Sequence, residues 1–188
     1  MATRIVAENL AFFVLACACL LWARWRTLPG PVFPGPRPVG PGFRAWLLVI
    51  WLVGLALPLA ALGFDGLVRG RSVVLLALLP YFAMFFAQVG SEIYVWKRWR
   101  SPIWVIIPCL YLPWRVYQQA VGLELTPGAD VPLTRFTLAA LLVLWIINVG
   151  VHYTNIVNTL RWDAHPPDAR FAALHDPRVF TANAQDPE

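Results

Sequence analysis

Residues 136–160 read FTLAALLVLWIINVGVHYTNIVNTL, a run of 25 residues that contains no Asp, Glu, Lys or Arg. An α-helix rises about 1.5 Å per residue, so about 20 apolar residues cross the roughly 30 Å hydrocarbon core of a bilayer. The run therefore predicts a transmembrane helix near 136–161. Outward from it, similar apolar runs predict three further spans, near 5–25, 45–64 and 72–97.

The segment at 101–123 is harder to interpret because it carries Arg115, Pro108 and Pro113. Each proline removes a helical hydrogen bond, although the interiors of membrane bundles tolerate this. The segment is therefore either a fifth span or a re-entrant or interfacial segment. The predicted fold class is an all-α integral membrane protein. Its domain at 1–162 is a polytopic bundle of five transmembrane helices, or of four plus one re-entrant segment.

The composition supports lipid as the solvent. Of 188 residues, 59% are hydrophobic and 13% charged, and the mean hydropathy is +0.62. Soluble domains are about 45–50% apolar and about 25% charged, and a chain this short cannot bury so large an apolar surface from water. The composition therefore excludes a secreted disulfide scaffold, a coiled coil, a disordered tail protein and an ordinary soluble enzyme. The three cysteines lie inside apolar runs without paired spacing, which predicts neither a metal nor a redox site.

Basic residues gather on one predicted side of the membrane. In the five-span arrangement, eight lie at the first and third loops and the C-terminal end, and four lie on the other side. The positive-inside tendency then places the loops at 26–44 and 97–101 in the cytoplasm. Seven tryptophans lie at segment ends on the same side, as in an interfacial aromatic belt. The net charge of +5 is therefore attributed to orientation, so we expect contact with the lipid bilayer and not with nucleic acid.

Two segments outside the apolar runs have distinctive compositions. The loop at 29–42 holds six prolines and four glycines, which predicts an extended, polyproline-like connector or a docking surface for a partner. The tail at 163–188 has few apolar residues, and we expect it to be solvated or to form a short surface helix.

The candidate functional residues are the polar side chains within the predicted spans. In the last span, Asn148, His152 and Asn155 are spaced by four and then three residues and form one helix face. In the third span, Gln88 and Glu92 are spaced by four and lie at most about 13 Å from the cytoplasmic interface, at depths that match His152 and Asn155, so the two faces could meet. Arg115 lies about 21 Å deep, so a salt bridge to Glu92 would have to close roughly 13 Å. We reject this salt bridge unless the segment at 101–123 is re-entrant, which would bring Arg115 back toward the cytoplasmic side. The candidate ligand-binding residues are His152, Asn148, Asn155, Gln88, Glu92 and Arg115.

Three functions are consistent with this pattern. Inward-facing amide and imidazole groups often act only as interhelical hydrogen bonds of roughly 0.6 kcal/mol each. We therefore favour a small non-catalytic subunit or assembly factor of a larger membrane complex, with a membrane-protein partner and no catalytic or metal residue. The first alternative is a protein that binds a lipophilic ligand, a pigment or a tetrapyrrole, photosynthetic or respiratory, with His152 as a single axial ligand. The second is a membrane-embedded enzyme or proton-coupled carrier that uses Glu92, His152 and Arg115.

Overall fold

The computed structural model describes residues 2–26, 41–99, 103–127 and 130–160, and every secondary-structure element in these ranges is a helix. The prediction of an all-helical chain is therefore confirmed for them. The predicted tail at 163–188 and most of the loop at 29–42 lie outside the described residues. The chain divides into two compact units, Met1–Thr154 and Asn155–Glu188, and the helix bundle lies in the first.

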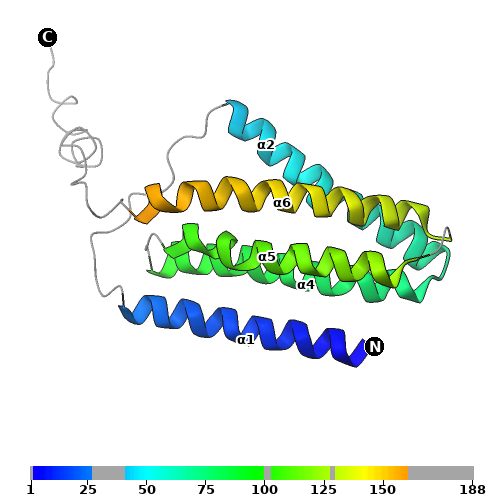
Figure 1. Ribbon diagram of the computed structural model, residues 1–188, viewed down its shortest axis with the longest axis horizontal. Coiled ribbons are helices and arrows are strands. Elements are labelled where there is room, and N and C mark those ends of the chain that lie inside the picture. The colour runs from blue at the N-terminus through cyan, green and yellow to red at the C-terminus, as the bar shows by residue number, and fades with distance from the viewer. Residues whose placement is uncertain (1, 27–40, 100–102, 128–129, 161–188) are drawn as a thin grey trace, which may run out of the picture. The chain divides into compact units, whose positions relative to one another are not determined.

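The helices of the bundle run alternately in opposite directions (Figure 1). The second of them is one continuous helical run over 41–68 that includes two π-helical stretches, and the third also ends in a π-helical turn. The elements are α1 (Ala2–Arg26), α2 (Pro41–Trp51), η1 (Leu52–Ala56), α3 (Leu57–Ala61), η2 (Leu62–Val68), α4 (Ser72–Tyr94), η3 (Val95–Trp99), α5 (Ile103–Leu125) and α6 (Pro132–Leu160).

Four helices in the described part of the chain are long and apolar enough to cross a membrane: Ala2–Arg26, Arg44–Val68, Ser72–Trp99 and Pro132–Thr154. The less apolar α5 is also one continuous helix of 23 residues. It does not double back within Ile103–Leu125, and whether it is a fifth span or an interfacial segment stays a prediction.

One boundary prediction needs correction. Pro41 and Gly42 were assigned to the extended loop, but they are the first two residues of α2. A proline is favourable at the start of a helix, because the first amide groups have no carbonyl partner there and its fixed φ suits the helix.

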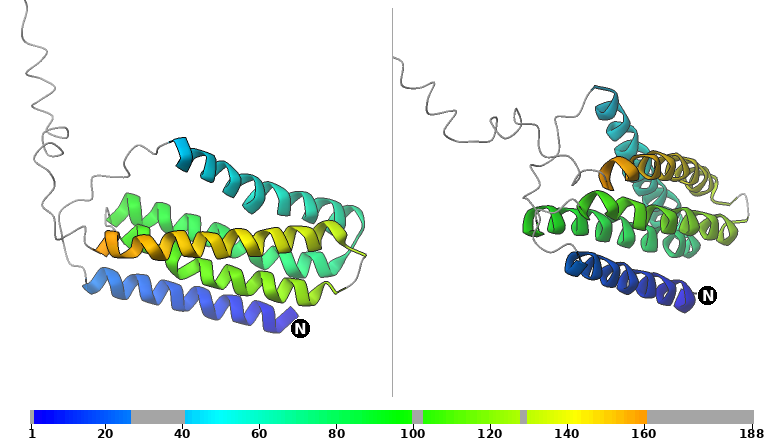
Figure 2. Two further views of the ribbon diagram at one scale, coloured as in Figure 1. Left: turned by 45° about the horizontal axis from the view of Figure 1, so that its top comes forward. Right: turned by 60° about the vertical axis from the view of Figure 1, so that its left-hand side comes forward.

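Two apolar clusters hold the bundle together. The larger joins the 41–68 run, α4, α5 and α6 around Trp145, Tyr81 and Leu138, which are all fully buried. The smaller joins α1 to η3 and α5 around Ala16 and Ile107. α1 accordingly packs on α4 and α5 (Figure 2).

Two glycines let neighbouring elements approach closely. A Cβ atom on Gly54 would lie 3.1 Å from the Trp145 ring, and one on Gly122 would lie 2.9 Å from the Leu138 side chain. Because lipid tails are as apolar as the side chains they would replace, helices in a membrane associate through such close packing and through hydrogen bonds. The polar contacts of the interior therefore matter for this bundle.

Candidate functional site

The Arg115 side chain lies in an aromatic enclosure at the centre of the bundle. Its residue is only 2% exposed. The guanidinium carbon lies 4.6 Å from the ring centroids of both Phe85 and Trp145, and 5.9 Å from that of Tyr81. Attraction between a cation and the negative faces of these rings stabilises the charge where water is excluded.

The hydrogen-bonding capacity of Arg115 is incompletely used. Its Nε and Nη2 atoms are buried without a hydrogen-bond partner, and so are the amide N and O atoms of Gln119, one helical turn further along α5. Among the described residues no hydrogen bond joins Arg115 to Gln118, Gln119 or Tyr111. Burial of a charge whose donors are only partly satisfied costs stability, so Arg115 destabilises this core.

Gln88 and Glu92 share one face of α4, as their spacing predicts. The Gln88 amide donates to the Glu92 carboxylate over 2.6 Å. No ion pair between Glu92 and Arg115 occurs in the described part of the chain, although the two charges are close enough to interact electrostatically. Arg115 lies instead against Trp145, within one helical turn of Asn148.

The described side chains on the polar face of α6 form hydrogen bonds with α2 and with the backbone of α6 itself. The buried Asn148 accepts a hydrogen bond from the Trp46 indole over 3.3 Å, and the half-buried His152 lies with Nδ1 3.0 Å from the Asn148 carbonyl of its own helix. The side chain of Asn155 is outside the described residues. Within the described ranges no hydrogen bond or ion pair joins this face to Gln88 or Glu92, so a meeting of the two polar faces stays a prediction. Asn148 turns toward α2 rather than toward α4.

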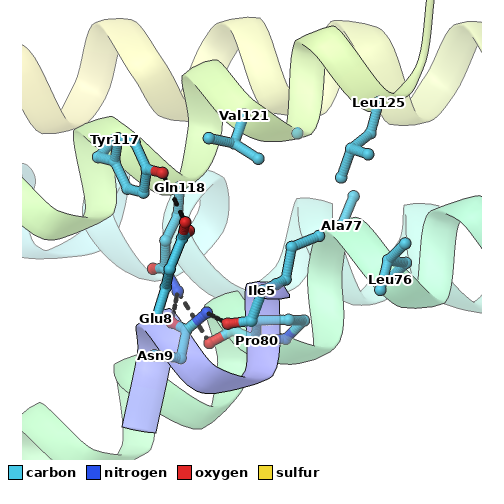
Figure 3. A pocket seen from close by; sticks show the side chains of 11 residues that line it. Ile5, Glu8, Asn9, Leu76, Ala77, Pro80, Tyr117, Gln118, Val121 and Leu125 are labelled. Carbon is cyan, nitrogen blue, oxygen red and sulfur yellow. Dashed lines mark hydrogen bonds between the residues drawn. The ribbon is translucent and has the colours of Figure 1, made fainter. Parts of the chain in front are cut away.

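A polar junction that the sequence interpretation missed fastens α1 to α5 (Figure 3). The Asn9 side-chain oxygen accepts hydrogen bonds from the Trp114 indole (3.1 Å) and from the Gln118 amide (2.6 Å). The same Gln118 amide also donates to the Pro80 carbonyl of α4 over 3.1 Å. The junction therefore links three helices through two amide side chains.

The same junction encloses a small cavity of about 20 Å³, lined in part by Glu8, Asn9 and Gln118. At its edge Glu8 accepts hydrogen bonds from Tyr117 (3.0 Å) and Arg4 (2.6 Å). A volume of roughly 10–15 Å³ suffices for one water molecule where polar partners are present. Asn9 was overlooked because it borders the charged Glu8 at the edge of the apolar run, and Asn is common there in any protein.

Two tyrosine hydroxyls donate to backbone carbonyls that lie four residues before a proline. The Gly54 carbonyl lies in the π-helical stretch η1, and Pro58 has no amide hydrogen to offer it in an α-helical turn. The Tyr81 hydroxyl of α4 donates to the Gly54 carbonyl instead, over 2.5 Å. Neighbouring groups in a membrane bundle commonly satisfy carbonyls freed in this way.

The second case lies in α5. Pro113 cannot donate to the Cys109 carbonyl four residues earlier, and the Tyr153 hydroxyl of α6 donates to it over 2.9 Å. The prolines were recognised as breaks in the helical hydrogen bonding, and the orphaned carbonyl four residues before each was the signal that could have been followed. The sequence does not indicate which side chain donates to that carbonyl.

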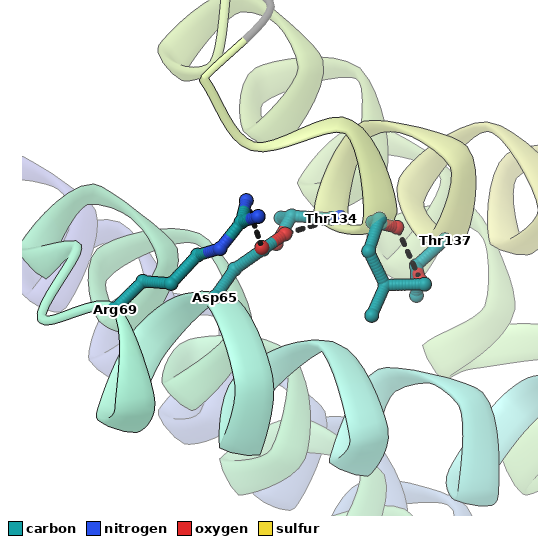
Figure 4. A network of polar contacts seen from close by, with 5 residues as sticks. Asp65, Arg69, Thr134 and Thr137 are labelled. Atoms are coloured by element: carbon teal, nitrogen blue, oxygen red, sulfur yellow. Dashed lines mark hydrogen bonds and ion pairs between the residues drawn. The ribbon is translucent and has the colours of Figure 1, made fainter.

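Asp65, also missed, caps the beginning of α6 (Figure 4). One carboxylate oxygen accepts hydrogen bonds from the backbone amide of Thr134 (2.9 Å) and from its hydroxyl (2.8 Å). The other oxygen lies 3.4 Å from the Arg69 guanidinium. A carboxylate at a helix N-terminus satisfies free amides and is favoured by the helix dipole. Asp65 had served only as the charged residue that ends an apolar run, although it is fully buried.

The arrangement favours structure over chemistry for most of these groups. No hydrogen bond or ion pair joins any two of Glu92, His152 and Arg115 among the described residues. Glu92 and Arg115 do interact electrostatically with each other and with Tyr111. Within the described ranges no three His, Cys, Asp or Glu residues are placed to hold a metal ion. In His152, Nδ1 faces the Asn148 carbonyl, and the other ring nitrogen, Nε2, is the one that could bind a ligand.

Comparison with known protein families, curated proteins and solved structures finds no match. The class of protein is therefore defined by the fold: an all-helical chain, in its described part, with four helices long and apolar enough to cross a membrane.

Proposed function

We propose that this chain is a five-span integral membrane protein that serves as a non-catalytic subunit or assembly factor of a larger membrane complex. The observation that carries the proposal is the use of interior polar groups as bonds between helices. Asn9 binds α5, Asp65 binds α6, Asn148 binds α2, and the Tyr81 hydroxyl binds η1. Side chains used in this way fix the positions of helices, which is the task of a scaffold.

The first part of the 41–68 run is the surface we assign to the partner subunit. None of the described residues of α2 is buried, whereas Gly54, Pro58, Ala61 and Asp65 further along the run are. Trp51 is 52% and Leu48 58% exposed. α2 contacts its own bundle through Trp46 and Ile50 without being buried in it, and it presents its exposed residues to lipid or to another membrane protein.

The assignment of α5 as the fifth span is supported by the direction of its polar side chains. Its 23 residues extend about 34 Å, enough to cross the hydrocarbon core. Arg115, Gln118 and Gln119 are all buried in the bundle interior rather than facing outward. Ionisable and amide groups tolerated at membrane depth typically face the interior in this way.

Charge supports the proposed orientation, with the loops at 26–44 and 97–101 in the cytoplasm. At the opposite end of the bundle, Arg4 pairs with Glu8 and Arg69 with Asp65, which offsets two of the basic charges there. At the proposed cytoplasmic end the described basic residues are Arg24, Arg26, Arg44, Lys97 and Arg98.

Cysteine labelling of intact cells tests span number and orientation together. In a variant without native cysteines, we expect Val39→Cys to be protected from an impermeant maleimide and Pro127→Cys to be labelled. Protection of both would place α5 outside the set of spans, and labelling of Val39→Cys would reverse the orientation.

Cross-linking in the membrane, followed by purification in mild detergent, tests the subunit function. A photoreactive residue at Trp51, which is exposed on α2, is expected to give one cross-linked membrane-protein partner of fixed stoichiometry. The matched probe at Phe136, exposed on α6, should not give that adduct. A protein that stays monomeric and yields no adduct at Trp51 would contradict the proposal.

A second candidate, a tetrapyrrole-binding protein, is favoured by the geometry of His152. Its Nδ1 atom faces the Asn148 carbonyl at 3.0 Å. When Nδ1 carries the proton, Nε2 has a free lone pair, which is the arrangement that a metal-ligating histidine commonly adopts. Bound tetrapyrrole would give the purified protein a Soret-region absorbance band that is lost in His152→Ala while helicity by circular dichroism persists. A colourless wild-type protein purified after growth with haem precursors would exclude this candidate.

A further inference from the structure

A groove in the bundle surface lies between α1 and the α4–η3 helix. Its volume is about 410 Å³, and its walls include Phe13, Cys17 and Leu21 from α1 and Gly90, Tyr94 and Trp99 from α4–η3. The Ser91 hydroxyl on its wall is already used, because it donates to the Ala87 carbonyl over 2.7 Å. The groove is therefore an apolar surface, which is suited to an apolar ligand.

Basic and aromatic residues stand at one end of this groove. The Arg24 guanidinium carbon lies 6.0 Å from the centroid of the Trp99 ring, and Trp99 itself lines the groove. Lys97 and Arg98 are exposed in the same helical turn as Trp99. Tryptophan favours the headgroup level of a bilayer, and basic residues at that level attract anionic lipid.

The charge at one end of the groove favours a lipid as its occupant. A hydrocarbon chain matches the apolar walls, and an anionic headgroup matches the basic and tryptophan residues at the end. A flexible hydrocarbon chain can fill such a space, and an unfilled one would forfeit the dispersion contacts of its lining.

We infer that this groove binds one acyl chain of an anionic phospholipid whose phosphate lies against Arg24, Lys97 and Arg98. The inference rests on the membrane insertion proposed above, and it names a lipid ligand that the subunit function does not require. The apolar groove selects the chain, and the basic end selects the charge of the headgroup.

Photolabelling of the full-length protein tests this directly. The protein is reconstituted in phosphatidylcholine vesicles that contain a trace of phosphatidylglycerol with a diazirine in its acyl chain, and adducts are mapped by mass spectrometry. We expect labelling at groove residues such as Cys17 and Gly90, and several-fold less from the matching phosphatidylcholine probe. Adducts spread over all lipid-facing helices, or equal labelling by both probes, would overturn the inference.

Two pairs of variants separate the chain from the headgroup. Gly90→Leu fills the groove and should abolish the groove adducts, whereas Gly150→Leu should not, since a Cβ on either glycine meets nothing within 4 Å. Arg24→Gln should lower phosphatidylglycerol labelling roughly fivefold, the effect of about one basic residue near an anionic surface. Arg26→Gln is the control, because Arg26 stacks on Trp22 and Trp25 and not on the groove.

Failure of this inference is distinguishable from failure of the proposed function. A protein recovered without detergent in the soluble fraction would refute membrane insertion and with it both proposals. A protein that inserts with the predicted cysteine topology but shows no groove adducts would refute the lipid site alone. The wild-type adduct map decides the matter even if a variant does not fold.

Discussion

Replacement of Tyr81 by phenylalanine tests whether a side chain repairs the hydrogen bonding that Pro58 breaks. Tyr81→Phe keeps the fully buried ring and its packing against Phe85 but removes the hydroxyl that donates to the Gly54 carbonyl over 2.5 Å. A buried carbonyl left unpaired costs about 1–3 kcal/mol, while side-chain hydrogen bonds measured in membrane bundles reach about 1.7 kcal/mol. We therefore expect the free energy of unfolding to fall by about 1–2 kcal/mol.

The cause is isolated by a double-mutant cycle with Pro58→Ala. In an α-helix, the alanine introduced by this substitution would supply the amide hydrogen that Pro58 lacks, so the Gly54 carbonyl would no longer need Tyr81. The packing cost of Pro58→Ala cancels in the cycle, and a coupling of about 1 kcal/mol remains. The free energy of unfolding is measured by titration with sodium dodecyl sulfate in mixed micelles, with Tyr94→Phe as an exposed control. If Tyr81→Phe costs the same in both backgrounds, the hydroxyl does not replace the missing donor and the reasoning fails.

Three further predictions concern the same interior. Tyr153→Phe should cost about 0.5–1 kcal/mol by the same titration, and the cost should vanish in Pro113→Ala, because that carbonyl is freed by the same mechanism. Arg115→Met should leave the melting temperature unchanged or raise it, because a buried cation with two unsatisfied donor atoms is replaced by an apolar chain of similar length; a fall of many degrees would contradict this. Asp65→Ala should cost about 1–2 kcal/mol by loss of the helix cap, and Asp65→Asn less, since its amide oxygen still accepts from Thr134.

The candidate site could be predicted only within single helices. The spacing of four between Gln88 and Glu92 placed them on one face of α4, and they are hydrogen-bonded there. Whether this face meets that of α6 could not be predicted, because residue spacing defines a face of a helix but not the rotation of that helix about its axis. Asn148 is turned to Trp46 of α2.

Arg115 illustrates the same limit. Its depth was predicted from a count of residues along α5, and its ring contact with Trp145 lies within one helical turn of Asn148, the residue at the matching depth. Its aromatic neighbours could not be counted, because Phe85 and Trp145 belong to two other helices. Aromatic residues are so frequent in this chain, at 14%, that their presence alone singles out none of them as a partner.

The sequence by itself determined that the described chain is helical and where its helices lie, because the length of an apolar run and the position of a proline or a charge are local properties. Only the tertiary structure decided which polar groups meet. Gln118 reaches Asn9 across 109 positions of sequence, and Tyr81 reaches Gly54 across 27. Those contacts depend on the rotation, tilt and spacing of packed helices. These in turn depend on close packing between helices, such as that of the Trp145 ring on the Gly54 backbone, and not on any repeat along one helix.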